Sequence, residues 1–330
     1  MRVLVTGGAG FIGSHYVRSV LTGAWGGPEP ESVVVLDKLT YAGNLQNLEP
    51  VAGDARLRVV EGDILDRSTV DRLMAEVDVV VHFAAESHVD RSILGAAEFV
   101  VTNVVGTQTL LDSALHHDIE KFVHVSTDEV YGSIEQGSWT EEEPLAPNSP
   151  YSASKASSDL FARAYHRTHG LPVCLTRCSN NSGPDQFPEK VIPLFVTNLM
   201  DGAQVPLYGE GANVRDWLHV DDHCRGLQLV LEGGRPGEVY NIGGGTELSN
   251  KELTGLLLEA TGSDWDRVIQ VTDRPGHDLR YSVDCAKIRT ELGYEPRVPF
   301  EQGLAETVEW YRANRAWWEP LKARAQLHGS

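Results

Sequence analysis

Short apolar runs alternate with longer amphipathic stretches through the first half of the chain. Four such runs stand at Arg2–Thr6, Val33–Leu36, Arg58–Val60 and Val77–Phe83. Their nearly continuous apolar character is typical of strands that are buried on both faces. Strands that alternate regularly with helices predict βαβ units, and therefore a parallel sheet covered by helices on both faces.

The same patterns predict the remaining elements of the sheet. These are strands at Phe122–Val125 and Val173–Arg177, with helices at Ser14–Leu21, Glu98–His116 and Tyr151–Thr168. A later strand, Glu238–Ile242, is expected to rejoin the sheet. We therefore predict an α/β fold, a doubly wound parallel sheet of the Rossmann type with a smaller mixed α/β substrate-binding lobe.

Composition narrows the classes of partner. The chain has 330 residues and a net charge of −19, with 41% hydrophobic and 23% charged residues. This length suits one large domain or two lobes, and the charge argues against nucleic acid and anionic membranes as partners. An anionic substrate would need a local cationic pocket that works against the overall field.

The four cysteines predict free thiols. Cys174, Cys178, Cys224 and Cys285 form no CxxC pair and do not cluster with histidines at metal-ligand spacing, so no metal site is expected. Free thiols favour a reducing compartment. No segment approaches the roughly 18 apolar residues that span a bilayer, and we predict a cytoplasmic protein.

A glycine-rich turn follows the first strand directly. Gly7, Gly10 and Gly13 permit a tight turn, close approach to a pyrophosphate and close helix packing, and the helix N-terminus then faces the phosphates. Asp37 ends the second strand, where a carboxylate can accept bonds from an adenosine ribose. This favours NAD over NADP as the cofactor, although neighbouring Lys38 would tolerate a 2′-phosphate.

The composition of the sequence changes after Cys178. Ser179–Lys190 is rich in turn formers and predicts a loop. We expect residues 1–178 to form the NAD-binding domain, to which segments near 215–245 could return. Residues 179–330 are then mainly a second lobe that binds the substrate.

Candidate acid and base groups gather at the end of the fifth strand. Thr127, Asp128 and Glu129 follow it, and Tyr151 and Lys155 stand four residues apart on one face of the next helix. Two adjacent carboxyl groups are useful only if one is protonated and the other is not, which proximity and burial can bring about. The pattern indicates acid–base chemistry at the edge of the sheet.

Cations for an anionic substrate are concentrated in the second half of the chain. Lys190, Arg215, Arg274 and Arg280, together with His277, lie in its loops and short strands. Arginine suits a diphosphate because its geometry is bidentate.

Together these motifs resemble the extended short-chain dehydrogenase/reductase family, and within it the nucleotide-sugar 4,6-dehydratases. The resemblance covers nearly the whole chain, to about Trp318. The matching blocks are GGAGFIG (Gly7–Gly13), DKLTYAGN (Asp37–Asn44), HFAAESHVDRS (His82–Ser92), STDEVYG (Ser126–Gly132), YSASK (Tyr151–Lys155), FPEKVIP (Phe187–Pro193) and DRPGHDLRY (Asp273–Tyr281).

The resemblance implies NAD-dependent dehydration of dTDP-glucose and a role for each candidate residue. Tyr151 would take the O4 proton as the sugar is oxidised at C4, with its pKa lowered by Lys155 and the nicotinamide cation. Thr127 would bond the same oxygen. Glu129 would remove the C5 proton, and protonated Asp128 would donate to the departing C6 hydroxyl before hydride returns to C6.

The resemblance also implies the binding residues. For NAD these are Gly7, Gly10, Phe11, Ile12, Gly13, Asp37, Lys38, Leu39, Thr40, Ala42, Asp63, Ile64, Ala84, Ala85, Thr102, Tyr151, Lys155 and Asn181. For the nucleotide sugar they are Ser87, Thr127, Asp128, Glu129, Asn180, Lys190, Val191, Pro206, Tyr208, Arg215, Asn250, Arg274 and His277. As in relatives, helices 98–116 and 151–168 are expected to form a four-helix interface in a homodimer.

Several alternatives remain open. A nucleotide-sugar 4-epimerase or a decarboxylase could use the same scaffold, although epimerisation needs no acid–base pair for C5 and C6. A non-catalytic dinucleotide sensor would need the glycine turn but not Tyr151 and Lys155. The nucleotide is thymidine or uridine.

One block departs from the family, which usually has NNYGPYQ where this chain has Asn180–Gln186. Ser182 and Asp185 replace two tyrosines. A carboxylate at 185 would weaken diphosphate binding if it pointed inward.

Overall fold

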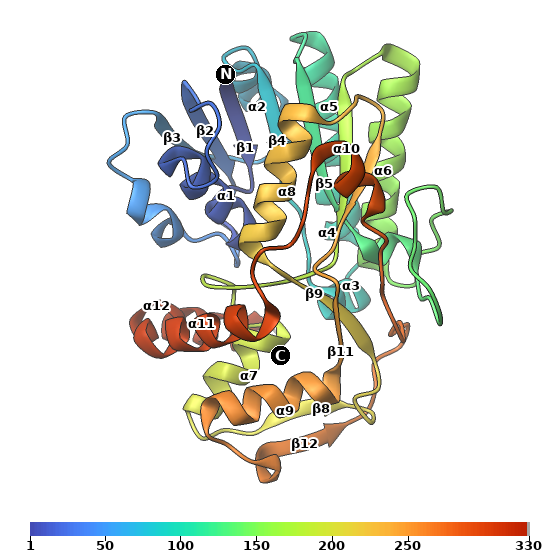
Figure 1. The fold of residues 1–330 in the computed structure, drawn as a ribbon. Coiled ribbons are helices and arrows are strands. Elements are labelled where there is room, and N and C mark those ends of the chain that lie inside the picture. Colours follow the sequence, from blue (N-terminus) through green and yellow to red (C-terminus); the bar gives the residue numbers. More distant parts are fainter. Residues whose placement is uncertain (329–330) are drawn as a thin grey trace.

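Seven parallel strands form the central sheet of the computed structural model, which describes residues 1–328 (Figure 1). Their order across the sheet is β10-β6-β5-β4-β1-β2-β3. They are β1 (Arg2–Thr6), β2 (Ser32–Asp37), β3 (Leu57–Glu61), β4 (Val79–His82), β5 (Lys121–Thr127), β6 (Val173–Cys178) and β10 (Val239–Ile242). The predicted doubly wound parallel sheet and the return of the late strand are confirmed.

Helices cover both faces because alternate strand residues on both faces are apolar. In β1, Val3 and Val5 belong to one buried cluster and Leu4 to the other. The first face is covered by α1 (Phe11–Thr22), α8 (Val220–Gly233) and α10 (Ala286–Leu292). The second is covered by α2 (Arg67–Met74), α5 (Thr107–His116) and α6 (Pro150–His169).

A second lobe lies below the sheet in Figure 1 and has its own apolar core, which includes Phe195, Leu257 and Trp318. Its strands form a three-stranded sheet of β11 (Thr246–Ser249), β9 (Val214–His219) and β7 (Asn180–Ser182), and a pair of β12 (Val268–Val271) and β8 (Val205–Tyr208). Its helices are α7 (Val191–Met200), α9 (Asn250–Thr261), α11 (Phe300–Ala313) and α12 (Arg315–His328).

Short elements account for the differences from the predicted pattern. They are η1 (Leu45–Val51), α3 (Val89–Leu94), α4 (Ala97–Phe99), η2 (Val100–Gly106), η3 (Asp128–Tyr131) and η4 (Trp265–Arg267). The long helix predicted at 98–116 is α4 and α5 joined by η2, a π-helical segment. Strand β7 lies within the loop predicted at 179–190, because its residues pair with β9, which is distant in sequence. Helix α12 continues to His328, where the described part of the chain ends.

A buried ion pair fixes α6 against the end of the sheet. Asp159 of α6 accepts from Arg177 Nε of β6 at 2.9 Å, and both side chains are fully buried. His124 Nε2 of β5 lies 3.3 Å from the second Asp159 oxygen, and Arg177 Nη1 donates to the Tyr131 hydroxyl at 2.8 Å. Burial lowers the pKa of His124, which favours its neutral form.

We expect Asp159→Asn to lower the free energy of unfolding by about 3–5 kcal/mol, because it leaves the Arg177 guanidinium buried without a countercharge. Urea denaturation measures the loss. The matched control is Glu309→Gln, which breaks an exposed pair with Arg312 and should cost less than about 1 kcal/mol. A similarly small loss in Asp159→Asn would contradict the importance of this pair.

Candidate active site

A cavity of about 360 Å³ lies beyond the carboxyl ends of the central strands. It is centred between β1 and β4, where the order of the sheet reverses direction and where ligands bind in folds of this kind. The turn after β1, the end of β2, the ends of β4 and β5, the start of α6 and the loop after β7 all contribute to its wall.

The glycine turn is required by close backbone approach. Gly7 has a φ of +70°, and a Cβ there would lie 2.6 Å from the Ala84 nitrogen at the end of β4. A Cβ on Gly13 would lie 2.3 Å from the Gly7 oxygen. The turn therefore leaves a backbone-lined cradle at the N-terminus of α1, which fits a pyrophosphate.

The ribose end of the cavity fits NAD. The two oxygens of buried Asp37 accept from the Ala9 and Leu39 amides, at 2.9 and 2.8 Å, while the residue lines the cavity. Burial raises the pKa of Asp37, and these two amides oppose that shift. Lys38 Nζ pairs with Asp63 at 2.7 Å, so its charge is already engaged and is not free for a 2′-phosphate.

The catalytic candidates meet where β5 and α6 converge. Lys155 Nζ donates to the Val125 carbonyl at 2.7 Å, which joins the helix to the strand. Thr127 is the last residue of β5, and its hydroxyl donates to Asp128 Oδ1 at 3.3 Å. Tyr151, at the first turn of α6, lines the same cavity as Thr127 and Asp128.

The local sequence explains where α6 begins. Ser149 is the N-cap, and its hydroxyl accepts from the Ser152 amide at 3.1 Å, with Pro150 as the first helical residue. The Tyr151 amide donates to the Ser92 hydroxyl at 3.1 Å. The tyrosine is therefore held through its backbone as well as by packing.

Burial raises the pKa values of both carboxyl groups, Asp128 and Glu129, above those of ordinary acids. It raises the pKa of Asp128 well above its usual value, and Glu129 and Asp216 add to the shift. Burial also raises the pKa of Glu129, but Lys190 and Arg215 oppose it. Asp128 Oδ2 is buried and has no hydrogen-bond partner among the described residues. Asp128 is thus suited to stay protonated and act as an acid, and Glu129 to be ionised and act as a base.

The expected lowering of the Tyr151 pKa is not found in the protein alone. Burial raises the pKa of Tyr151 well above its usual value, Glu129 adds to this, and the Thr127 hydroxyl opposes it. The Lys155 ammonium is directed to the Val125 carbonyl, and burial lowers the pKa of Lys155 itself. Ionisation of the phenol therefore depends on a further positive charge in the cavity.

Three of the predicted cations, Lys190, Arg215 and Arg274, lie near enough to Glu129 for their charges to lower its pKa. Lys190 Nζ donates to the Ser87 carbonyl at 2.7 Å, and Arg215 donates to the Asp278 carbonyl at 3.0 Å.

Two of the predicted cations form ion pairs with carboxylates. Arg274 pairs with Asp90 at 3.0 Å. Arg280 instead pairs with Glu247 at 2.7 Å and does not line the cavity.

Most predicted site residues line this one cavity. Those that do are Gly7, Gly10, Phe11, Ile12, Gly13, Asp37, Lys38, Thr40, Ala42, Asp63, Ile64, Ala84, Ala85, Ser87, Thr102, Thr127, Asp128, Glu129, Tyr151, Lys155, Asn180, Asn181, Lys190 and Val191. Those that lie outside its lining are Leu39, Pro206, Tyr208, Arg215, Asn250, Arg274 and His277. Leu39 contributes its backbone amide to Asp37, and Arg274, Tyr208 and His277 form a contiguous aromatic and cationic group in the second lobe.

Sequence reasoning missed several residues at the site. Gln186, Phe187, Glu189 and Trp217 line the cavity. Phe187 and Glu189 lie inside a motif that was recognised, but nothing in the pattern showed their orientation. Asp216 was also missed; burial raises its pKa to about 6, and its charge opposes ionisation of Asp128.

The two residues that depart from the family pattern point away from the diphosphate region. Asp185 Oδ2 pairs with Arg18 of α1 at 2.7 Å. Ser182 is buried in β7 beside β9. Neither lines the cavity, so the inward-pointing carboxylate considered from the sequence is not found.

Residues 1–328 hold neither a candidate metal cluster nor a membrane-spanning helix. No group of three or more potential metal ligands occurs there, and no helix within that range is long and apolar enough to cross a membrane. The four cysteines are free thiols.

Comparison with known proteins shows what the chain resembles. A family model described as GDP-mannose 4,6 dehydratase matches residues 4–307. The dTDP-glucose 4,6-dehydratase of Streptomyces antibioticus is 66% identical over 325 residues, which cover 98% of this chain and 96% of that protein. The crystal structure of DesIV, a dTDP-glucose 4,6-dehydratase from Streptomyces venezuelae with NAD and TYD bound, has a TM-score of 0.96 at 66% identity and covers 97% of this chain and 100% of that one. UDP-glucose 4-epimerase from Thermotoga maritima, solved with UDP-glucose, has a TM-score of 0.87 at 33% identity and covers 96% and 100%.

Proposed function

Because the chain belongs to the GDP-mannose 4,6-dehydratase family, we propose that it converts dTDP-glucose to dTDP-4-keto-6-deoxyglucose with bound NAD. The relatives at 66% identity carry out, by their names, dTDP-glucose 4,6-dehydration, and one of them was solved with NAD. The chain is accordingly an NAD-dependent lyase, with a place in deoxysugar biosynthesis.

The observation that carries this proposal is the pair Asp128 and Glu129 at the end of β5. Asp128 is buried and Glu129 is partly buried; both line the same cavity as Tyr151, and their surroundings differ in charge. Eliminating water from C5 and C6 needs one base and one acid on neighbouring carbons. This pair supplies both.

Each residue has a distinct task. The Tyr151 phenol takes the proton from the O4 hydroxyl, and Thr127 holds that oxygen. Once C4 is a ketone, the C5 proton is acidic, and Glu129 removes it. Asp128 gives its proton to the leaving C6 hydroxyl, which departs as water. A proton is finally returned to C5.

NAD, when bound, accepts hydride from C4 and returns it to C6, and its positive ring favours the ionised phenol. The Gly7–Gly13 turn would hold its pyrophosphate and Asp37 its adenosine ribose. Lys190, Arg215 and Arg274 would bind the diphosphate of the substrate. This local cationic group would attract the diphosphate against the repulsion from a net charge of −19.

A 4-epimerase on the same scaffold is the rival function, since such an enzyme shares the fold at 33% identity. Epimerisation needs oxidation at C4 and rotation of the sugar, but no acid for C6. A buried Asp128 with an unpartnered oxygen would then have no task. The site therefore favours dehydration.

The function is tested by incubating the purified protein separately with dTDP-glucose and UDP-glucose and assaying the products. We expect a 4-keto-6-deoxy product, formed more efficiently from dTDP-glucose. Formation of the C4 epimer instead would contradict the proposal. Comparable turnover of dTDP-glucose and UDP-glucose would contradict only the proposed preference for the thymidine nucleotide.

We expect Glu129→Gln to reduce product formation by at least about 10²-fold, because the variant lacks the base for C5. Reduced cofactor should still accumulate, since oxidation at C4 precedes this step, and solvent deuterium should not enter C5. Tyr151→Phe is the contrasting variant and should block reduction of the cofactor as well. Full turnover in Glu129→Gln would refute its role.

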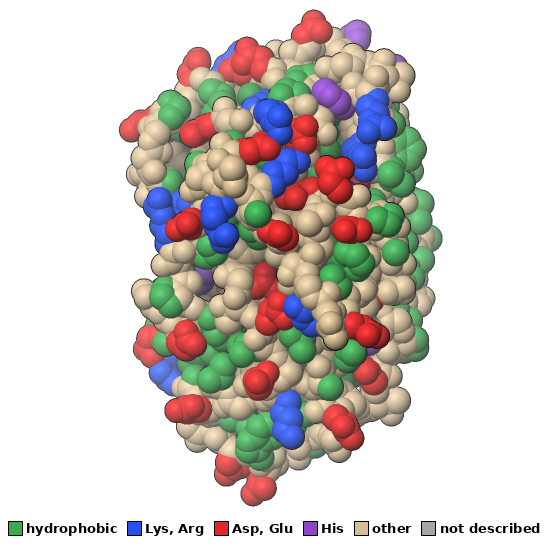
Figure 2. All heavy atoms as spheres, turned by 45° about the vertical axis from the view of Figure 1, so that its right-hand side comes forward, with side chains coloured by type: hydrophobic (Ala, Val, Ile, Leu, Met, Phe, Trp, Pro, Cys, Tyr) green, Lys and Arg blue, Asp and Glu red, His purple; other side chains and the backbone are tan. Residues whose placement is uncertain are grey.

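The outer surface of two neighbouring helices supports a homodimer. Val101 and Val105 of η2 are each 45% exposed, and Leu160 and Phe161 of α6 are 55% and 41% exposed. These helices pack together, and Figure 2 shows hydrophobic side chains along the edge of the molecule that carries α6. Soluble monomers rarely expose contiguous apolar surface of this kind. We propose a four-helix interface between two copies.

The interface is tested by sedimentation velocity at micromolar concentration. We expect the wild type to sediment at twice the chain mass and Leu160→Glu to sediment as a monomer, because a buried charge opposes association. Ile269→Glu in β12 is the control, since Ile269 is also exposed but lies in the second lobe. A wild-type protein that sediments as a monomer would refute the proposed four-helix interface.

A further inference from the structure

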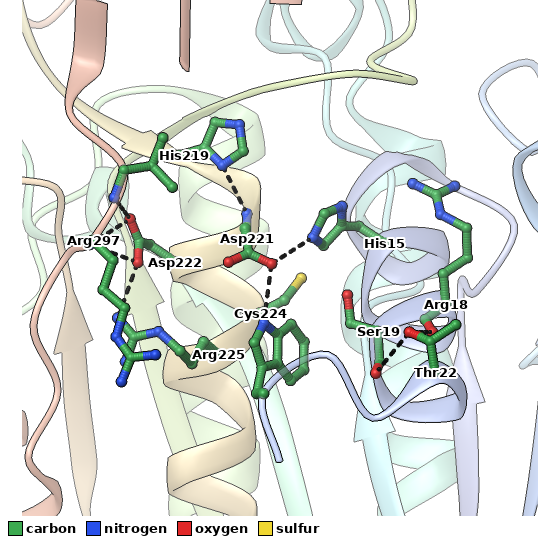
Figure 3. Close-up of polar contacts among 12 residues, drawn as sticks. His15, Arg18, Ser19, Thr22, His219, Asp221, Asp222, Cys224, Arg225 and Arg297 are labelled. Carbon is green, nitrogen blue, oxygen red and sulfur yellow. Dashed lines mark hydrogen bonds and ion pairs between the residues drawn. The ribbon is translucent and has the colours of Figure 1, made fainter. Parts of the chain in front are cut away.

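Helix α1, whose first turn borders the cofactor end of the cavity, is anchored firmly on one side. His15 Nε2 lies 3.1 Å from Asp221 Oδ1 of α8, and the Tyr16 hydroxyl donates to Gln228 at 2.7 Å. Figure 3 shows His15 reaching across to Asp221 while Arg18, on the same helix, points away from α8. On the α8 side, α1 is therefore a fixed part of the first domain.

On its other side, α1 is joined to the loop that follows β7. Arg18 Nη2 lies 2.7 Å from Asp185 Oδ2, and the two side chains are only 17% and 13% exposed. Arg18 Nη1 also donates to the Asn47 carbonyl of η1, which orients the guanidinium. Asp185 adopts a φ of +66°, a backbone conformation that few residues other than glycine and Asp or Asn accept.

The loop held by Asp185 forms one wall of the cavity. Gln186, Phe187 and Glu189 follow shortly after Asp185 and line the cavity. The Phe187 ring packs edge-on against Tyr41, with ring centroids 5.6 Å apart, in the segment that follows β2. The loop thus extends from α1 to the segment after β2, and it forms the wall of the cavity between them.

We propose that the Arg18–Asp185 ion pair clasps the loop 183–190 to α1 and so slows the loss of bound NAD. The proposal rests on the proposed function only for the identity of the cofactor. Arg18 and Asp185 are positioning residues, since neither lines the cavity. Redox-neutral turnover returns the cofactor to its starting state, so one NAD that stays bound can be used again in every catalytic cycle.

The experiment measures NAD release from the holoenzyme, by exchange with labelled NAD, without any product assay. We expect Asp185→Asn and Arg18→Gln each to raise the release rate by roughly tenfold, because each leaves one charge of a half-buried pair without its partner. The double variant should release NAD no faster than the single variants, since both break the same contact.

The matched control is Asp201→Asn, which breaks ion pairs with Arg315 and Lys322 in the second lobe. It should leave NAD release unchanged even if its melting temperature falls. With excess NAD present, turnover of Asp185→Asn should approach that of the wild type, because the loss lies in cofactor retention.

Three outcomes would overturn the clasp. They are wild-type release from Asp185→Asn, equal effects in Asp185→Asn and Asp201→Asn, and additive effects of the two single variants. If Asp185→Asn fails to fold, Asp185→Glu keeps the charge and should release NAD within about twofold of the wild type. Faster release from that variant would count equally against the clasp. A protein that retains NAD but forms no 4-keto product would refute the proposed function and leave the clasp intact.

Discussion

The arrangement of this site depends on the contact between the Lys155 ammonium and the Val125 carbonyl, 2.7 Å apart. Burying an ammonium is costly unless it is paired or hydrogen-bonded. One turn along α6, Asp159 supplies the opposite charge that favours the protonated lysine, and Arg177 of β6 holds Asp159 in place. Polar contacts between buried groups therefore fix the helix to the end of β5. This fixes Tyr151 opposite Thr127 and the carboxyl groups.

Two neighbouring carboxyl groups acquire different properties because different parts of the chain surround them. Asp128 lies near Asp216 of β9, whose charge opposes its ionisation. Glu129 lies near Lys190 and Arg215, which favour its ionisation. Burial alone would raise both pKa values. The second lobe therefore contributes to the acid–base chemistry as well as to binding.

Loops that join the two lobes complete the cavity. The loop after β7 is held to α1 by Arg18 and Asp185, and Lys190 at its end bonds the Ser87 carbonyl near the end of β4. These contacts connect segments more than a hundred residues apart. Within the first domain, Asn103 likewise connects segments that are distant in sequence. Its amide group forms hydrogen bonds with the Glu86 backbone and the Ser154 hydroxyl.

The sequence by itself determined the sheet, the glycine turn and the residue types at the strand ends. These depend on short-range periodicity and on side-chain chemistry, both of which can be recognised from residues close together in the sequence. It also placed Thr127, Asp128 and Glu129 beside Tyr151, because the carboxyl ends of parallel strands share one edge. The tertiary structure decided which charges meet. Arg280 forms an ion pair with Glu247, Lys38 with Asp63, and Asp185 with Arg18. It also decided that Lys155 bonds Val125, and that the pKa of Tyr151 is raised in the protein alone. Pairing and burial depend on distances between residues far apart in the chain, and no local pattern contains those distances.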